Sequence, residues 1–99
     1  MTEQKMEVLR EKLHTAMIEL GLEETVINGK INYLWNGKCV AVSYYQTYAA
    51  IEIAGNVSEA KRNLYEDLDI YEYSYMENSQ KDIFGEMRQD IVQYVVERY

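Results

Sequence analysis

Cysteine and histidine are scarce in this 99-residue sequence, and the shortage excludes several kinds of site. Cys39 is the only cysteine, so the chain can form no internal disulfide and no multi-cysteine metal site. His14 is the only histidine, which excludes a two-histidine metal site, and no nucleophile motif or second base surrounds it. The five glycines are isolated from one another, so no glycine-rich phosphate loop is present. We therefore expect no metal, no cofactor and no enzymatic activity.

Long apolar runs are also missing. Residues 1–20 carry charges throughout and lack the apolar stretch of a signal peptide. Nowhere does the chain approach the about 20 consecutive apolar residues of a membrane span. A single thiol is typical of a reducing compartment. We expect a cytoplasmic protein that does not bind membranes.

Positive charge is in short supply. Seventeen Asp and Glu oppose ten Lys and Arg, which gives a net charge of -7, and the basic residues are scattered along the chain. Direct binding to nucleic acid depends on Lys and Arg that neutralise phosphates, so an acidic chain is repelled. We expect a basic protein partner and no direct contact with nucleic acid.

Proline is absent, and no repeat or low-complexity tract marks a linker. Apolar residues make up 47% of the chain and aromatic residues 12%, which is enough to bury one core without disulfides. A chain of this length is expected to form one domain, which we assign to residues 1–99.

The first twenty residues predict a helix. Thr2 suits the N-cap and Gly21 suits the helix end. Between them, apolar side chains recur at spacings of three and four and line one helical face: Met6, Leu9, Leu13, Ala16, Met17 and Leu20.

The next stretch predicts strands. Asn28-Gly29 and Asn36-Gly37 indicate type I′ turns, because these positions need the positive φ that glycine accepts and asparagine tolerates. A two-residue turn at Asn36-Gly37 pairs Trp35 with Lys38 and places six side chains on the core side of a hairpin: Ile31, Tyr33, Trp35, Val40, Val42 and Tyr44. A third strand is expected over Tyr48–Ala54. Whether Glu24–Ile27 adds another strand stays open.

The second half of the chain predicts a helix, a strand and a helix. Asn56 with Glu59 resembles a capping box, so we expect a short helix from Val57 to about Glu66. A strand or extended arm over Asp67–Met76 and a last helix over Ser79–Arg98 follow. The whole predicts an α+β domain of order α-β-β-β-α-β-α. Its sheet would be largely antiparallel, with three to four strands and helices packed on one face.

An acidic, tyrosine-rich segment, residues 63–80, contains no Lys or Arg. Tyrosine is common at interfaces, and beside carboxylates it suits partners rich in Arg and Lys. Strand alternation places Asp69, Tyr71, Tyr73 and Tyr75 on one side, and Leu68, Ile70 and Glu72 on the other. We interpret seven residues as a partner-binding surface: Glu66, Asp67, Asp69, Tyr71, Glu72, Tyr73 and Tyr75. The alternative, that these tyrosines only cover the sheet edge, stays open.

The charge density of this segment limits how closely it can imitate nucleic acid. Five carboxylates lie between Glu66 and Glu77. This span is about 36 Å if extended at about 3.3 Å per residue, whereas duplex DNA carries a charge about every 1.7 Å. Helix carboxylates would have to join the segment in three dimensions, and the candidates are Glu59, Asp82, Glu86 and Asp90.

In its short length, strong acidity, lack of catalytic motifs and acidic, tyrosine-rich face, the chain resembles one class of small inhibitors. These are the proteins that bacteriophages and mobile elements encode against host defence nucleases, including anti-CRISPR proteins and DNA mimics. The resemblance implies a non-enzymatic inhibitor in the cytosol of the host cell. It would block a basic nucleic-acid or nucleotide site of a defence protein.

Two other functions stay open. One is a homo-oligomeric adaptor or regulatory protein, such as a homodimer, whose tyrosines form the subunit interface. The other is a sponge for a small signalling nucleotide. A sponge needs basic and aromatic side chains gathered in a pocket, for which the candidates are Lys30, Lys38 and Arg62 near Trp35.

Overall fold

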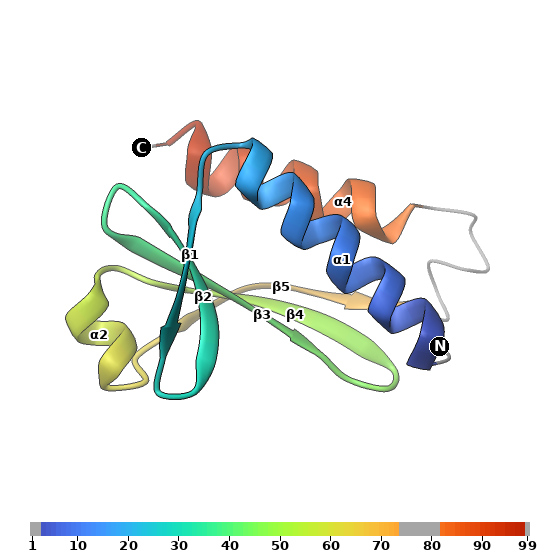
Figure 1. Cartoon of the computed structure of the whole chain (residues 1–99), viewed down its shortest axis with the longest axis horizontal. Helices are drawn as coiled ribbons and strands as arrows, with labels where there is room; N and C mark the ends of the chain where they lie inside the picture. Colours follow the sequence, from blue (N-terminus) through green and yellow to red (C-terminus); the bar gives the residue numbers. More distant parts are fainter. Residues whose placement is uncertain (1–2, 74–81, 99) are drawn as a thin grey trace.

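Residues 3–73 and 82–98 are described here in a computed structural model (Figure 1). The elements in chain order are α1 (Glu3–Glu19), β1 (Glu23–Ile27), β2 (Lys30–Trp35), β3 (Lys38–Tyr44), β4 (Tyr48–Ala54), α2 (Val57–Lys61), β5 (Glu66–Glu72), α4 (Ile83–Ile91) and a π-helical turn, η1 (Val92–Val96). The predicted α+β class and antiparallel sheet are confirmed. The sheet has five strands rather than three or four, because the stretch left open before Asn28 does form a strand.

Two tight turns set the register of the first three strands. Asn28-Gly29 and Asn36-Gly37 all have positive φ, between 47° and 84°, as type I′ turns require. Trp35 pairs with Lys38 and Tyr33 with Val40, which is the register that the second turn predicts. The strand order β1-β2-β3-β4-β5 follows the sequence, so β1 and β5 are the two edges of the sheet.

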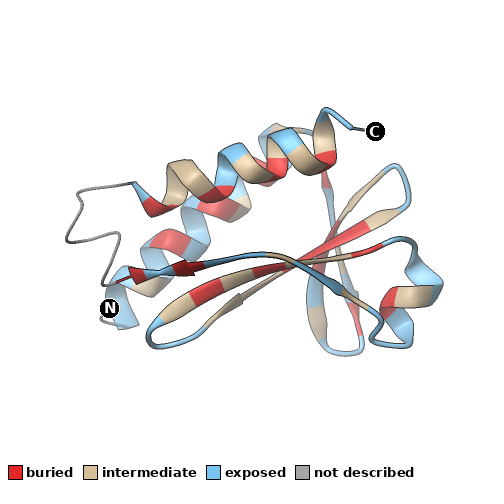
Figure 2. Cartoon of the chain, turned by 180° about the vertical axis from the view of Figure 1, so that it is seen from behind, coloured by how far each residue is buried: buried red, intermediate tan, exposed pale blue. Residues whose placement is uncertain are grey.

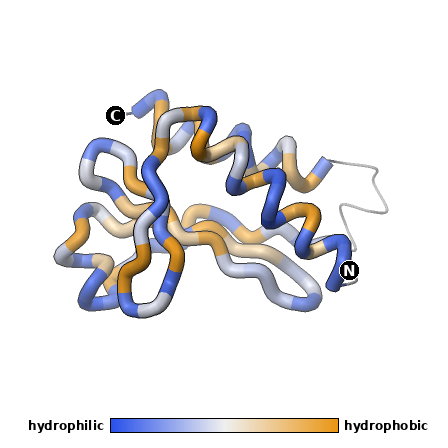
Figure 3. Tube along the Cα trace, viewed as in Figure 1, coloured by the Kyte–Doolittle hydropathy of each residue, from blue (hydrophilic) through white to orange (hydrophobic). Residues whose placement is uncertain are grey.

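The helices α1 and α4 cover one face of the sheet (Figure 1). Buried residues lie along the strands and at intervals along these two helices (Figure 2). Along α1, hydrophobic and hydrophilic residues alternate as an amphipathic helix requires (Figure 3). The main core cluster combines helix residues with inward-facing sheet residues, chief among them Leu9, Leu13, Met17, Met87, Ile91, Tyr33, Val40, Ile51, Tyr71 and Tyr73.

Most of the predicted hairpin face is confirmed. Trp35, Val42 and Tyr44 pack against the core cluster, and Tyr33 and Val40 belong to it. Ile31 was expected there, but it is 47% exposed and pairs with Val26, which is 64% exposed. The reason is that the turn between β1 and β2 lies away from α1 and α4, so that neither long helix covers the side of the hairpin that carries Val26 and Ile31 (Figure 1).

The short helix α2 is correctly predicted at its start and wrong at its end. The amide of Glu59 donates to Asn56 Oδ1 at 2.8 Å, and Glu59 Oε2 accepts from the amide of Gly55 at 3.0 Å. The helix ends at Lys61 instead of near Glu66, since Asn63 adopts a left-handed φ of 58°. Its Ala60 packs with Cys39 and Ala54 in a second cluster, so α2 covers the sheet face opposite to α1 and α4, which corrects the expectation that the helices pack on one face.

The ends of two other predicted elements fall partly outside the described residues. The described part of the last helix begins at Ile83, with Asp82 as its N-cap, while Ser79 lies outside the described ranges. The strand predicted to reach Met76 ends at Glu72, since Tyr73 is described and is not part of it, while residues 74–76 lie outside the described ranges. Among the helices described in these ranges, none has the length and apolar composition needed to cross a membrane.

Replacing Met87 with alanine should test the packing of α4. Met87 is fully buried, so the free energy of unfolding should fall by about 2–5 kcal/mol, as for other buried large-to-small changes. Arg88→Ala is the matched control, because Arg88 is the next residue along and is exposed. It should change stability by less than about 0.5 kcal/mol in the same denaturant titration. Equal losses from both substitutions would mean that α4 does not pack as described.

Candidate functional site

The four carboxylates predicted at the partner surface line the edge strand β5. Glu66, Asp67, Asp69 and Glu72 are all exposed. Asp69 Oδ1 also accepts a hydrogen bond of 2.8 Å from the amide of Ile70. The acidic part of the predicted site is therefore at the surface, on a single strand.

The aromatic part of that prediction is corrected by the structure. Tyr71 and Tyr73 are each 1% exposed and belong to the main core cluster, so their rings are not available to a partner. Tyr71 lies opposite Ala49, whose small side chain leaves room for the ring. Burying two large rings releases more apolar surface from water than burying carboxylates could, and this decides which side of β5 faces inward. Tyr75 lies outside the described residues.

A bulge breaks the alternation that the sequence predicts for β5. Asp69 pairs with Ile51 and Asp67 with Glu52, so one extra residue of β5, Leu68, is inserted between them. Leu68 packs against the main core cluster, whereas Ile70, which was predicted on the same side, is 54% exposed. The inserted residue changes which side chains share a face.

A hydrogen bond joins β5 to α4 at the acidic surface. The hydroxyl of Tyr71 donates to Asp90 Oδ2 at 2.6 Å. Burial raises the pKa of the Tyr71 phenol, and the hydrogen bond to Asp90 and the charges of Asp90, Asp69 and Glu86 raise it further. Two helix carboxylates, Glu86 and Asp90, thus act on the same phenol as Asp69 of β5, and both were among the candidates named from the sequence. We name Glu66, Asp67, Asp69, Glu72, Glu86 and Asp90 the acidic surface.

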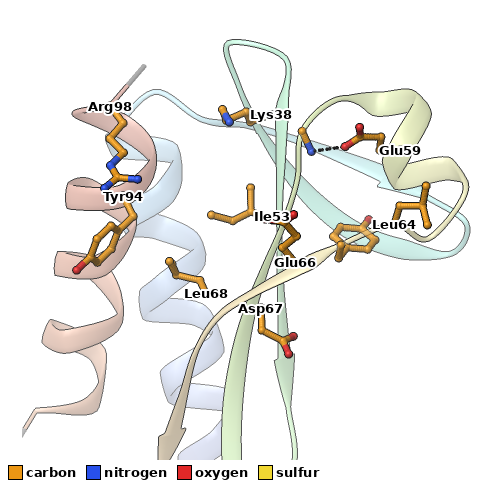
Figure 4. Close-up of a pocket in the computed structure, with 11 residues that line it drawn as sticks. Lys38, Ile53, Glu59, Leu64, Glu66, Asp67, Leu68, Tyr94 and Arg98 are labelled. Carbon is orange, nitrogen blue, oxygen red and sulfur yellow. Dashed lines mark hydrogen bonds between the residues drawn. The ribbon is translucent and has the colours of Figure 1, made fainter.

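A cavity of about 550 Å³ opens at one end of this surface, between β5, α2 and the end of the C-terminal helix (Figure 4). Apolar and aromatic side chains form part of its lining: Ile53, Leu64, Leu68, Tyr65 and Tyr94. Charged side chains of both signs form the rest: Lys38, Arg98, Glu59, Glu66 and Asp67. Sequence reasoning missed this cavity, because its residues come from β3 through to the C-terminal turn and no motif connects them.

His14 takes part in a polar contact that the sequence did not indicate. Its Nδ1 lies 2.8 Å from the hydroxyl of Tyr33, and its Nε2 lies 3.7 Å from Glu24 Oε2. Burial and the charge of Glu24 raise the pKa of Tyr33, so this phenol is protonated at neutral pH and is no activated nucleophile. The contact connects α1 to β1 and β2.

Three further reactive or basic groups named from the sequence, Cys39, Lys30 and Trp35, have other neighbours in the structure. Burial raises the pKa of the Cys39 thiol, which disfavours the reactive thiolate. The Lys30 ammonium lies 4.4 Å from the centre of the Tyr65 ring and 3.9 Å from Glu52 Oε1, while Trp35 packs against the core. In residues 3–73 and 82–98, no group of three or more acidic, cysteine or histidine side chains is arranged to hold a metal ion.

No protein-family model, curated protein or solved structure was found to match this chain. Its function is therefore inferred from its own surfaces, chiefly the acidic surface and the adjoining cavity.

Replacing Tyr71 with phenylalanine should show what the hydroxyl contributes. The substitution keeps the ring and removes the hydrogen bond to Asp90. Hydrogen bonds to charged groups contribute about 1.5–3 kcal/mol, so the free energy of unfolding should fall by roughly that amount. Tyr45→Phe is the matched control, because Tyr45 is 46% exposed, and it should leave stability unchanged. A Tyr71→Phe protein as stable as the parent would contradict the role given to this bond.

Stability should also decline at alkaline pH. Burial raises the phenol pKa of Tyr33, Tyr44, Tyr71 and Tyr73 above the ordinary value of 10.0. Above that pH the unfolded chain loses these protons while the folded chain keeps them, so unfolding becomes more favourable as pH rises. Each such phenol can contribute a slope of up to about 1.4 kcal/mol per pH unit.

Denaturant titrations at several pH values on both sides of 10, read together with phenolate absorbance, measure this decline. Below pH 10 these phenols should not change the free energy of unfolding as pH varies, and above pH 10 the free energy of unfolding should fall. Ionisation of all the tyrosines before any unfolding would show that the four hydroxyls are accessible to solvent.

Proposed function

We propose that this chain is a non-enzymatic binding protein whose acidic surface occupies a basic nucleic-acid or nucleotide site on a protein partner. Its biological role would be that of a phage-type or mobile-element inhibitor of a host defence nuclease. The supporting observation is that the charges of Asp69 on β5 and of Glu86 and Asp90 on α4 all act on the Tyr71 phenol, beside three further exposed carboxylates of β5, in a chain with a net charge of -7.

Electrostatic attraction suits this role. Charges at a protein surface act over about 8 Å at physiological ionic strength, so closely spaced carboxylates attract a basic patch together. From Asn63 to Gln80 the sequence has no Lys or Arg that could neutralise them from within the same segment. Complementary charge mainly accelerates association and selects the partner.

The charge spacing supports a partial imitation of nucleic acid. β5 has seven residues, so its six steps span about 20 Å at about 3.3 Å per residue and carry four carboxylates. That density is well below one charge per about 1.7 Å in duplex DNA, even when Glu86 and Asp90 are added. The surface therefore fits a patch of a few Arg and Lys side chains rather than a long DNA-binding groove.

Recognition would use side chains and not strand addition. An edge strand normally offers unpaired amides to another strand, and charged side chains and bulges prevent this. β5 has both charged side chains and a bulge. In addition, the amide of Ile70 already donates a hydrogen bond to the Asp69 carboxylate, so it is not free for another strand. A partner would meet the carboxylates first.

Aromatic contact, if the partner needs it, would come from the turn between β3 and β4. The Tyr45 and Tyr48 rings lie 4.7 Å apart, and Tyr48 pairs with Glu72 at the end of the acidic surface. These two replace Tyr71 and Tyr73 as the tyrosines next to the carboxylates.

A homo-oligomeric adaptor is the second candidate. One observation favours it, which is that Val26 and Ile31 form an exposed apolar cross-strand pair on the hairpin of β1 and β2. In that case the interface would lie at the opposite edge of the sheet from the acidic surface.

Inhibition assays on a panel of purified DNA- and RNA-guided nucleases test the main proposal. The chain should inhibit at least one of them, in competition with its nucleic-acid substrate and less strongly at high salt. The variant E66Q/D67N/D69N/E72Q should lose inhibition, because the charges that attract the basic site are removed while shape is kept.

The control variant E3Q/E7Q/E11Q/E19Q changes the same number of carboxylates on exposed positions of α1. Both variants lose four negative charges, so only the location differs. The control should keep inhibition within about threefold, a difference of about 0.65 kcal/mol. If both variants lost inhibition equally, overall charge and not the acidic surface would explain the effect. If the parent chain inhibited none of the nucleases, the proposal would be wrong.

A further inference from the structure

The two edges of the sheet differ in how well they are protected against pairing with another strand. β5 carries exposed carboxylates along its length and contains a bulge. β1 contains no lysine or proline, its two charges are confined to Glu23 and Glu24 at its start, and its five pairs with β2 follow one another without a register shift. Lysine, proline and bulges are the usual protections of an edge strand. β1 is therefore the edge at which a further strand can pair.

The turn between β1 and β2 determines which backbone groups point to this free edge. A two-residue turn at Asn28-Gly29 makes Ile27 and Lys30 a hydrogen-bonded pair, and such pairs alternate with non-bonded ones along an antiparallel ladder. The amides and carbonyls of Ile27 and Thr25 thus point toward β2. Those of Val26 point away from it, toward an incoming strand.

Apolar surface lies beside this edge. Val26 and Ile31 form a cross-strand pair and are 64% and 47% exposed. Their side chains are on the same sheet face as Tyr33, which is two residues after Ile31, yet neither α1 nor α4 covers them (Figure 1). An antiparallel second copy of β1, with its Val26 opposite this Val26, would place four apolar side chains in one row across the joined sheet.

The charges at the two ends of β1 are opposite in sign and lie on one sheet face. Glu23, at the start, pairs with Leu34, which packs against the cluster that α2 covers, so Glu23 faces the α2 side. At the other end, Asn28 Nδ2 donates to the carbonyl of Lys61 at 2.6 Å, which joins the turn to the basic end of α2. Lys61 and Arg62 are both exposed. Antiparallel pairing about a two-fold axis therefore brings the acidic end of each copy to the basic end of the other.

We propose that two copies of this chain pair through β1, antiparallel and with Val26 opposite Val26 of the second copy, into a dimer with one continuous sheet. Backbone hydrogen bonds supply affinity, while the apolar row and the contact of Glu23 with the basic end of α2 fix the register. Because β5 is the opposite edge of each sheet, the two acidic surfaces lie far apart, separated by nine strand intervals of about 4.8 Å, or about 43 Å. Charges are screened over about 8 Å, so the net charge of each copy does not prevent association.

Sedimentation equilibrium over a dilution series tests the dimer. The parent chain should show a monomer–dimer equilibrium, and V26K should weaken it about tenfold or more, because two ammonium groups then meet at the centre of the interface. V8K is the matched control, since Val8 is a valine of α1 that is 48% exposed and the substitution adds the same charge. It should keep the dissociation constant within about threefold. A parent chain that stays monomeric at about 1 mM, or equal weakening by both substitutions, would overturn the inference.

A mixing experiment tests the charge contacts in a way that damage to the fold cannot imitate. E23K alone and K61E alone should each dimerise more weakly than the parent, because like charges then meet at both contacts of the dimer. An equimolar mixture should recover association. In the mixed dimer the new lysine of E23K meets the new glutamate of K61E, and the other contact is that of the parent. A mixture that associates no better than either variant alone contradicts this pairing.

The register is tested by V26C under mild oxidation. In a hydrogen-bonded antiparallel pair the Cα atoms lie about 5.5 Å apart, within the about 4.4–6.8 Å that a disulfide spans. The native Cys39 is buried, so the introduced thiol is the accessible one. V26C should form a covalent dimer much faster than V8C, which presents an equally exposed thiol on α1. Equal rates would show that Val26 does not face its counterpart.

This inference rests on the second candidate function, the homo-oligomeric adaptor, and is independent of nuclease inhibition. V26K leaves the acidic surface intact, and E66Q/D67N/D69N/E72Q leaves β1 intact, so dimerisation and inhibition can be measured separately in each variant. A dimer that forms equally well with V26K would keep the adaptor candidate and would show that its interface is not β1.

Discussion

The hydrogen bond from Tyr71 to Asp90 connects the last helix to the edge strand β5, and together with the burial of the Tyr71 ring it fixes which side of β5 faces inward. Side chains alternate along a strand, so a tyrosine held inward at position 71 turns Ile70 and Glu72 outward. The same bond brings Asp90 to the strand, and Glu86 is close enough for its charge to raise the pKa of Tyr71. One contact therefore buries an aromatic ring in the core and assembles carboxylates from two elements at the surface above it.

The bulge in β5 has two consequences for the surface. It allows Leu68 to reach the core although the strand alternation would turn it outward, and it leaves Glu66 and Asp67 at the rim of the cavity. The early end of α2 at Lys61, followed by the left-handed turn at Asn63, brings Leu64 and Tyr65 to the same rim. Charged side chains and the bulge also protect this edge from pairing with another strand. Protection of the edge and recognition of a basic partner would thus use the same carboxylates.

Local patterns predicted much of the fold, and tertiary packing explains where they failed. The helical stripe of α1, the positive φ of the Asn-Gly turns and the cap at Asn56 depend on neighbours within a few residues, so sequence reasoning found them. The burial of Tyr71 depends on the size of Ala49 across the sheet and on Asp90 in α4, and neither is a neighbour in sequence. The bulge at Leu68 could not be read from alternation, which assumes that no residue is inserted. The exposed carboxylates of β5 could be predicted because they are close in sequence, while the cavity was missed because its residues are not.

The most direct test of the account is to map where a basic ligand touches the chain. An oligoarginine peptide added to the isotope-labelled protein at low and at physiological salt should shift amide signals of β5 and of α4 near Glu86 and Asp90, and the shifts should weaken as salt rises. The signals of α1 serve as the internal reference, since that helix carries exposed glutamates of its own. Shifts confined to β5 and α4 are the predicted result. Shifts of equal size on α1, or spread evenly over the chain, would contradict the claim that the acidic surface is a distinct binding site.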